Sequence, residues 1–157
     1  MKKSYWLLLI GILILAGCAG EQAYLPTPNL VISQAAINYS TNPDNPNTVT
    51  FTEKNIGDAD AGKHVTYVEI TLTDADSADD PQCQYTLEIT DPITVGSTWS
   101  PDPIPFEKFS CPVDRGSLDL YSLENAPPGI ARLVVMADAK LEVVESSEND
   151  NRFEVIQ

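Results

Sequence analysis

The sequence predicts an all-β domain, a β-sandwich of about seven strands. Beyond the N-terminal region, apolar and polar residues alternate with a period of two, as in strands with one buried face. Turn-forming residues separate these runs at short intervals, and no stretch sustains the 3.6-residue period of a helix. The chain of 157 residues is long enough for one such domain, and its hydrophobic fraction of 43% is enough for a core.

The expected strands follow one another with clear turns between them. They are residues 30–39, 48–52, 67–72, 83–90, 130–137 and 153–156, with a short hairpin arm at 140–144. Residues 130–137 are apolar on both faces apart from Arg132, which predicts a central strand. Residues 91–125 are irregular and rich in proline, so we expect a long excursion there, with room for one helical turn near residues 118–123.

The N-terminus carries an export signal. Lys2 and Lys3 precede an apolar run that is shorter than the about 20 residues needed to cross a membrane. The run ends in Leu15-Ala16-Gly17-Cys18, which resembles the lipobox of prokaryotic lipoproteins, where the cysteine is acylated and becomes the mature N-terminus. The alternative is an uncleaved membrane anchor with a chance cysteine. We predict a signal peptide at residues 1–17, a lipidated tether at 18–28 and a folded domain at 29–157.

The predicted location is extracytoplasmic, with a lipid such as palmitate on Cys18 holding the chain to a membrane. Ala19 follows the cysteine at the position where some lipoproteins carry an inner-membrane retention Asp. We therefore expect the outer membrane where the host has one, and otherwise the cell surface. The tether reaches at most roughly 35 Å, so the domain should sit close to its membrane.

The cysteine count predicts a disulfide. The chain has three cysteines, and lipidation of Cys18 leaves Cys83 and Cys111 as an even pair in an oxidising compartment. The alternative is two separate buried thiols. A bridge over a loop of this length stabilises a fold by on the order of 3 kcal/mol.

The net charge of −14 excludes some partners. A nucleic-acid-binding protein needs a basic patch to neutralise phosphates, so no nucleic-acid partner is expected. The same charge argues against a surface that lies flat on anionic lipid.

Two segments resemble one family. Residues 49–62 contain Lys54-Asn55-Ile56-Gly57 before a small acidic turn, and residues 134–151 end in Val143-Val144-Glu145-Ser146-Ser147-Glu148-Asn149-Asp150-Asn151. Together they resemble CARDB, the cell-adhesion-related domain of bacterial and archaeal surface proteins, over about residues 28–157. The resemblance implies an immunoglobulin-like sandwich with a binding or adhesive role and no catalysis.

The motif residues are interpreted as turn formers. Asn55 and Asn151 can satisfy backbone groups where the chain reverses, and Gly57 permits a positive φ. Glu145 and Glu148 complete the second motif. Glu53 stands where the family usually has an aliphatic residue, so we expect that end of the strand to be exposed.

Three acidic clusters raise the question of a cation. One groups Asp58 with Asp60, and another groups Glu145, Glu148 and Asp150. The EF-hand pattern is absent, so the leading interpretation is solvated acidic loops, with no metal and no cofactor. Ca²⁺ remains the alternative, with weak candidate ligands in one loop at Asp74, Asp76, Asp79 and Asp80.

No catalytic residue is predicted. His64 is the only histidine, no Gly-x-Ser-x-Gly motif exists, and a lone histidine after a turn is expected to be exposed or at an edge. The aromatic residues of the irregular middle are candidates for binding, but a small core packed around the disulfide explains them better. They are Trp99, Phe106, Phe109 and Tyr121.

These observations support a non-enzymatic, lipid-anchored module that binds a protein or polysaccharide through its loops or an edge strand. The alternative is a structural or accessory lipoprotein that acts as a spacer in an envelope complex, with or without stabilisation by Ca²⁺. A Ca²⁺-dependent or catalytic protein has the least support.

Overall fold

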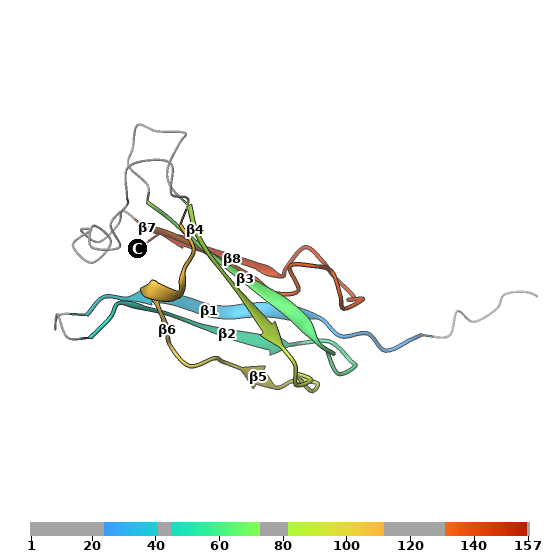
Figure 1. Ribbon diagram of the computed structural model, residues 1–157. Helices are drawn as coiled ribbons and strands as arrows, with labels where there is room; N and C mark the ends of the chain where they lie inside the picture. Colours follow the sequence, from blue (N-terminus) through green and yellow to red (C-terminus); the bar gives the residue numbers. More distant parts are fainter. Residues whose placement is uncertain (1–23, 41–44, 73–81, 112–130, 157) are drawn as a thin grey trace, which may run out of the picture.

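The computed structural model describes residues 24–40, 45–72, 82–111 and 131–156. Its strands form two antiparallel sheets that face each other as a β-sandwich, as the sequence predicts (Figure 1). The first sheet has the order β1-β2-β5, with β6 also paired to β2, and the second has the order β4-β3-β7-β8. The bounds are β1 Leu30–Asn38, β2 Thr48–Asn55, β3 His64–Leu72, β4 Gln82–Ile89, β5 Thr98–Trp99, β6 Ile104–Pro105, β7 Ala131–Met136 and β8 Arg152–Ile156.

Alternation explains why these segments form strands with one inward face. In β2 every second residue is buried, and in β7 Leu133 and Val135 are fully buried. Strand β7 lies between β3 and β8, so the expected central strand is confirmed. The core lies between the sheets and is built mainly from Leu30, Ile32, Ile37, Val49, Phe51, Val68, Ile70, Leu133 and Val135.

Strand β1 changes phase in its middle. Ile32 and Ala35 both point inward although three positions separate them, because the register with β2 shifts between Ile32 and Gln34. A bulge inserts one extra residue into a strand and thereby corrects the phase of the side chains that follow. The bulge keeps both halves of β1 on the core.

The predicted excursion contains short regular elements. Strands β5 and β6 extend the first sheet along β2, and a 3₁₀ turn, η1, covers Phe106–Lys108. The helical turn considered near residues 118–123 lies outside the described residues. The expectation that residues 140–144 form a strand of a hairpin is wrong. The amides of Glu142 and Val143 donate to the carboxylate of Asp138 instead of to a neighbouring strand.

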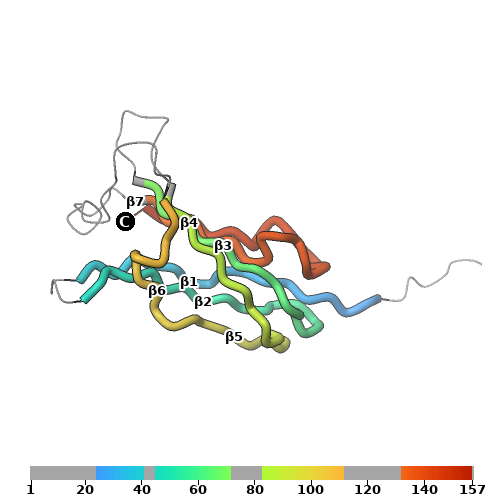
Figure 2. The backbone as a smooth tube through the Cα atoms, viewed as in Figure 1, coloured from blue at the N-terminus to red at the C-terminus, as the bar shows by residue number. Residues whose placement is uncertain are grey.

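Several connecting segments lie together at one end of the sandwich. The chain enters β1 there, and the β2–β3 turn, the β4–β5 loop and the β7–β8 connection lie at that same end (Figures 1 and 2). Backbone hydrogen bonds join them: Asp58 N donates to Thr27 O over 2.9 Å, and Ser146 N donates to Pro28 O over 2.9 Å. We call this the entry end.

Candidate functional site

The β7–β8 connection, residues 137–151, is a compact arm at the entry end. Its base closes where Ala137 N donates to Asn151 O over 2.9 Å. Asp138 has a φ of 41°, a left-handed conformation that Asp tolerates better than most residues. Its carboxylate accepts hydrogen bonds from Glu142 N and Val143 N, both over 2.8 Å. The side chain that starts the arm therefore also shapes it.

Three carboxylates converge inside the arm. One oxygen each from Asp138, Glu145 and Glu148 lies within 4.8 Å of the other two. Asp138 is buried, Glu145 is half-buried and Glu148 is exposed. Among the described residues, no Lys or Arg forms an ion pair with any of them. The group is a concentration of negative charge with neutral hydrogen-bond donors around it.

Glu145 shows the electrostatic cost of this arrangement. Burial, together with the charges of Glu148 and Asp138, raises the pKa of Glu145 to about 7, although hydrogen bonds from the Leu30 amide and from Asn151 act in the opposite direction. A carboxylate that is both desolvated and next to like charges favours its neutral form.

Two buried amides border the carboxylates. Asn151, 4% exposed, donates from Nδ2 to Glu145 Oε1 over 3.1 Å and to Glu148 Oε2 over 3.4 Å. Asn29, 8% exposed, donates from Nδ2 to Asp150 Oδ2 over 3.1 Å. The Oδ1 atoms of both amides are buried without a hydrogen-bond partner in the described part of the chain. Such an atom is costly unless something else compensates it.

The arm also holds the segment that leads into β1. Leu30 N donates to Glu145 Oε2, and Ile56 N donates to Asn29 O over 2.7 Å. Asn55 lies at the centre of this junction. Its Oδ1 accepts from Asn29 N and Gly57 N, and its Nδ2 donates to Ala59 O and Ile93 O. One side chain thus fills all its hydrogen-bonding capacity with four backbone groups from three segments: the entering chain, the β2–β3 turn and the β4–β5 loop.

Gly57 is required for a reason other than the expected one. Among the described glycines only Gly96 has a positive φ, so the expected conformational role of Gly57 is wrong. A Cβ at position 57 would lie 2.4 Å from Asn29 N and 2.5 Å from Thr27 O. Glycine therefore allows the entering chain to pass directly against the β2–β3 turn.

A second buried carboxylate lies across the sandwich from its partner. Glu53 of β2 and His64 of β3 belong to opposite sheets, and both side chains are fully buried. His64 Nε2 lies 2.5 Å from Glu53 Oε1, and Thr66 Oγ1 donates to Glu53 Oε2 over 2.8 Å. The expected exposure of Glu53 is wrong, and so is the expected edge position of His64, because each side chain compensates the burial of the other.

Both ring nitrogens of His64 face acceptors. Nδ1 lies 2.9 Å from the carbonyl oxygen of Gly62, and Nε2 faces Glu53, so the ring satisfies both contacts as an imidazolium. Burial lowers the pKa of His64, but the hydrogen bond and charge of Glu53, the Gly62 carbonyl and the charge of Asp138 together raise it above 6.5. A buried ring with both nitrogens occupied has no free position for a substrate.

The aromatic side chains of the excursion pack inward. Phe106 and Phe109 are 4% and 6% exposed, and Phe109 stacks on Tyr85 with 5.6 Å between ring centroids. Trp99 packs against Phe51 at 6.2 Å. The sequence analysis favoured an inward-packed core over a binding surface for these side chains, and they do pack inward, but Phe106 and Phe109 belong to the main core and Trp99 packs against it. Tyr121 lies outside the described residues.

The disulfide is present. Cys83 of β4 and Cys111 are joined with an S–S distance of 2.05 Å, and a backbone bridge between Gln84 and Ser110 runs beside them. The bond fixes the end of the excursion to the edge of the second sheet. The predicted lipidation site, Cys18, lies outside the described residues, as do the weak calcium candidates Asp74, Asp76, Asp79 and Asp80.

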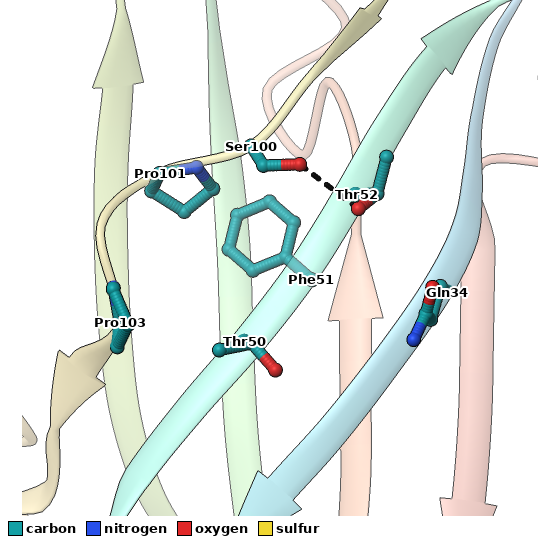
Figure 3. Close-up of a pocket in the computed structure, with 7 residues that line it drawn as sticks. All are labelled: Gln34, Thr50, Phe51, Thr52, Ser100, Pro101 and Pro103. Carbon is teal, nitrogen blue, oxygen red and sulfur yellow. Dashed lines mark hydrogen bonds between the residues drawn. The ribbon is translucent and has the colours of Figure 1, made fainter.

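Two open hollows lie on the surface. One of about 170 Å³ lies between the outer face of the first sheet and residues 100–103 (Figure 3). Gln34, Thr50 and Thr52 reach it from the strands, and the Phe51 ring lies beside Pro101. The second, about 420 Å³, is lined by charged and apolar residues of β3, β4 and the arm, namely Lys63, His64, Val65, Glu88, Ile89, Thr90, Lys140 and Glu142.

The fold and these contacts define a disulfide-bonded β-sandwich with an acidic arm at its entry end. No protein-family model matches the sequence, and no curated protein matches it. Among solved structures, the chain is similar to the CARDB domain of a Pyrococcus furiosus protein crystallised in complex with di-metal ions. The identity is 16%, the match covers 83% of this chain and 88% of that one, and the TM-score is 0.37. Because the identity and the TM-score are this low, the similarity supports no statement about the site, which is defined by this chain's own residues alone.

Sequence reasoning identified Glu145, Glu148 and Asn151 as motif residues and included Asp138 in the same segment, residues 134–151, but it did not group Asp138 with the carboxylates, and it missed Asn29. Asp138 follows a run of apolar residues directly, so an acidic residue at a strand end was the available signal. Asn29 precedes β1 and carries no comparable signal. In the part of the chain that the structure describes, no helix is long and apolar enough to cross a membrane.

Proposed function

We propose that this chain is a lipid-anchored, extracytoplasmic binding module without catalytic activity, attached to its membrane through Cys18. The disulfide between Cys83 and Cys111 is the observation that carries the proposal. Disulfides persist in exported proteins, and this one accounts for two of the three cysteines, which leaves Cys18 at the end of the lipobox-like segment. Sandwich domains of this kind work mainly by presenting surfaces.

The position of the tether orients the domain. Residues 18–28 precede β1, so the entry end faces the membrane and the opposite end faces away from it. Exposed apolar side chains gather at the entry end, including Tyr24 and Leu25 before β1 and Val95 in the β4–β5 loop. The faces of the sheets remain accessible in this orientation.

The outer face of the first sheet is the surface we propose for the partner. Gln34, Thr50 and Thr52 present amide and hydroxyl groups around the hollow, and Ser100 and Thr52 share a hydrogen bond of 2.9 Å (Figure 3). Its volume of about 170 Å³ is below the roughly 300 Å³ at which small-molecule pockets begin. A single unit of a polysaccharide or one side chain of a protein fits it better than an enclosed ligand.

The absence of catalysis is supported by His64. Its ring is buried between Gly62 and Glu53, so the only imidazole of the sequence cannot serve as a general base for a bound substrate.

Lipidation is tested by labelling cells with palmitate and measuring the mass of the mature protein. The wild type should carry the label and begin at Cys18, whereas Cys18→Ala should lose the label and keep residues 1–17. A wild-type chain with an unmodified N-terminus that still contains its leader would refute the anchor.

The partner is tested by photo-crosslinking in intact cells. A photoreactive residue at Gln34, beside the hollow, should capture a defined protein or polysaccharide, whereas the same residue at Gln84, exposed on the second sheet, should not. Equal capture from both positions, in one fixed envelope assembly, would favour the spacer function instead.

A further inference from the structure

The arm contains a group of charges that the proposed binding surface does not use. Oxygens of Asp138, Glu145 and Glu148 lie within 4.8 Å of one another, and no described Lys or Arg pairs with them. Like charges at such distances repel, and the repulsion grows as the groups lose contact with water. The repulsion within such a group is relieved either by a proton on one carboxylate or by a bound cation.

Asn151 is an independent observation that points to a ligand. Its amide is aimed into the group, since Nδ2 lies 3.1 Å from Glu145 Oε1 and 3.4 Å from Glu148 Oε2. Asn151 is only 4% exposed, and its Oδ1 has no hydrogen-bond partner in the described part of the chain. Turning the amide over exchanges nitrogen for oxygen, and it would then offer its unused oxygen toward the carboxylates.

The hydrogen bonds that Asp138 makes to the arm do not use up its oxygens. Each carboxylate oxygen accepts one N–H, from Glu142 or Val143, over 2.8 Å. An ionised carboxylate has about four lone-pair positions, so both oxygens keep capacity for a cation. A role in shaping the turn is therefore compatible with a role as a ligand.

The donor set selects the type of cation. It consists of carboxylate and amide oxygens without sulfur or imidazole, which suits a hard cation and not zinc. Two ligands on opposite sides of Ca²⁺ are about 4.6 to 5.2 Å apart, and around Mg²⁺ about 4.2 Å. The three carboxylate oxygens lie within 4.8 Å of one another, close enough for all of them to reach one ion, and the irregular set of donors suits the flexible shell of Ca²⁺ better than the strict octahedron of Mg²⁺.

We propose that Asp138, Glu145, Glu148 and Asn151 bind one Ca²⁺ ion, with water completing the coordination. The ion would fix the arm to the entering chain, because the second oxygen of Glu145 accepts the Leu30 amide hydrogen and Ser146 N donates to Pro28 O. Millimolar Ca²⁺ outside cells is sufficient for extracellular sites of modest affinity. The site would stiffen the junction between the tether and the domain.

The test uses the full chain purified in detergent, freed of metal with EDTA and dialysed at pH 8. Calorimetric titration with CaCl₂ should show one saturable site with a dissociation constant of about 0.1 to 1 mM. Thermal unfolding should shift upward by about 4–8 °C at 10 mM Ca²⁺. Mg²⁺ should bind at least tenfold more weakly, since it demands a smaller and more regular shell.

Two single substitutions locate the site. Glu148→Gln removes an exposed ligand charge and should weaken Ca²⁺ binding at least tenfold without unfolding the domain, which circular dichroism checks. Glu142→Gln removes an equal charge from the same arm, outside the carboxylate group, and should leave the dissociation constant within about twofold of the wild type. The proposal is overturned by the absence of saturable binding up to 10 mM, by equal effects of the two variants, or by equal binding of Mg²⁺.

Discussion

The molecule contains two buried acidic regions that solve the same problem differently. Glu53 is fully buried in the core, and the chain itself supplies a cationic ring from His64 and a hydroxyl from Thr66. Asp138 is 1% exposed at the entry end and faces two more carboxylates, with only neutral N–H donors in direct contact. The charge of His64 also acts on Asp138, but its ring is held by Glu53 and Gly62.

The two regions differ in whether the chain itself supplies the positive charge that balances the buried carboxylate. An internal cation makes Glu53 part of the fold, since the pair connects the two sheets through the core. The carboxylate group of the arm has no described Lys or Arg beside it, and under the proposal above a cation from solution supplies the countercharge. The predictions below test whether this division is correct.

The largest effect is expected from Glu53→Ala. The substitution leaves the imidazolium of His64 buried without its acceptor, and loss of one partner of a buried pair costs about 3 to 5 kcal/mol. Urea unfolding at pH 6 measures the loss. Glu88→Ala, which removes a carboxylate from the exposed face of β4, should change the free energy of unfolding by less than about 0.5 kcal/mol. Similar effects of the two substitutions would show that the core pair is not special.

A smaller effect is expected in the pH dependence of stability. The pKa of His64 is raised above 6.5 in the folded state, so the folded state binds more protons than the unfolded one in that range. The contribution is complete below pH 6.5 and disappears as the pH rises through the folded pKa.

Glu53→Gln removes the negative charge that raises the pKa of His64, so that burial, which lowers it, is opposed only by the Gly62 carbonyl and the charge of Asp138. The loss of stability between pH 5.5 and 7.5 should then become smaller, because His64 no longer gains protons on folding to the same extent, whereas the titration of Glu145 contributes equally in both proteins. Unfolding curves at pH 5.5, 6.5 and 7.5 for both proteins provide the comparison. A wild-type stability that stays level or rises across this range, unchanged in Glu53→Gln, would rule out the charged pair.

The fold was largely predictable, but the polar pairs were not. Alternation of side chains located the main strands, because a period of two depends only on local order. The central position of β7 followed from a different signal, apolar residues on both faces of the strand. The burial of Glu53 and His64 was not predicted because the two residues lie in different sheets. The sequence of one strand does not reveal which residue of the opposite sheet will face it. The disulfide was predictable from the count of cysteines together with the export signal, which sets Cys18 apart and implies an oxidising compartment.

The arm was only half predictable for a similar reason. Glu145, Glu148 and Asn151 were recognisable as a motif because they lie close together in the sequence. Asp138 joins them because its own carboxylate folds the arm back, through the amides of Glu142 and Val143. The strand expected at 140–144 failed at the same point, since those hydrogen bonds replace the cross-strand ladder.

The smallest effect, about 0.5 kcal/mol, is expected from Glu148→Gln, and its sign is the informative part. In EDTA the substitution removes one of three like charges while the Gln oxygen still accepts from Asn151, so stability should rise slightly. In 10 mM CaCl₂ the same substitution removes a ligand, so stability should fall below that of the wild type. Thermal unfolding of both proteins in both buffers, with Glu142→Gln as the charge-matched control, measures the inversion. A change of the same sign in both buffers would mean that the arm, like Glu53, is compensated from within the chain.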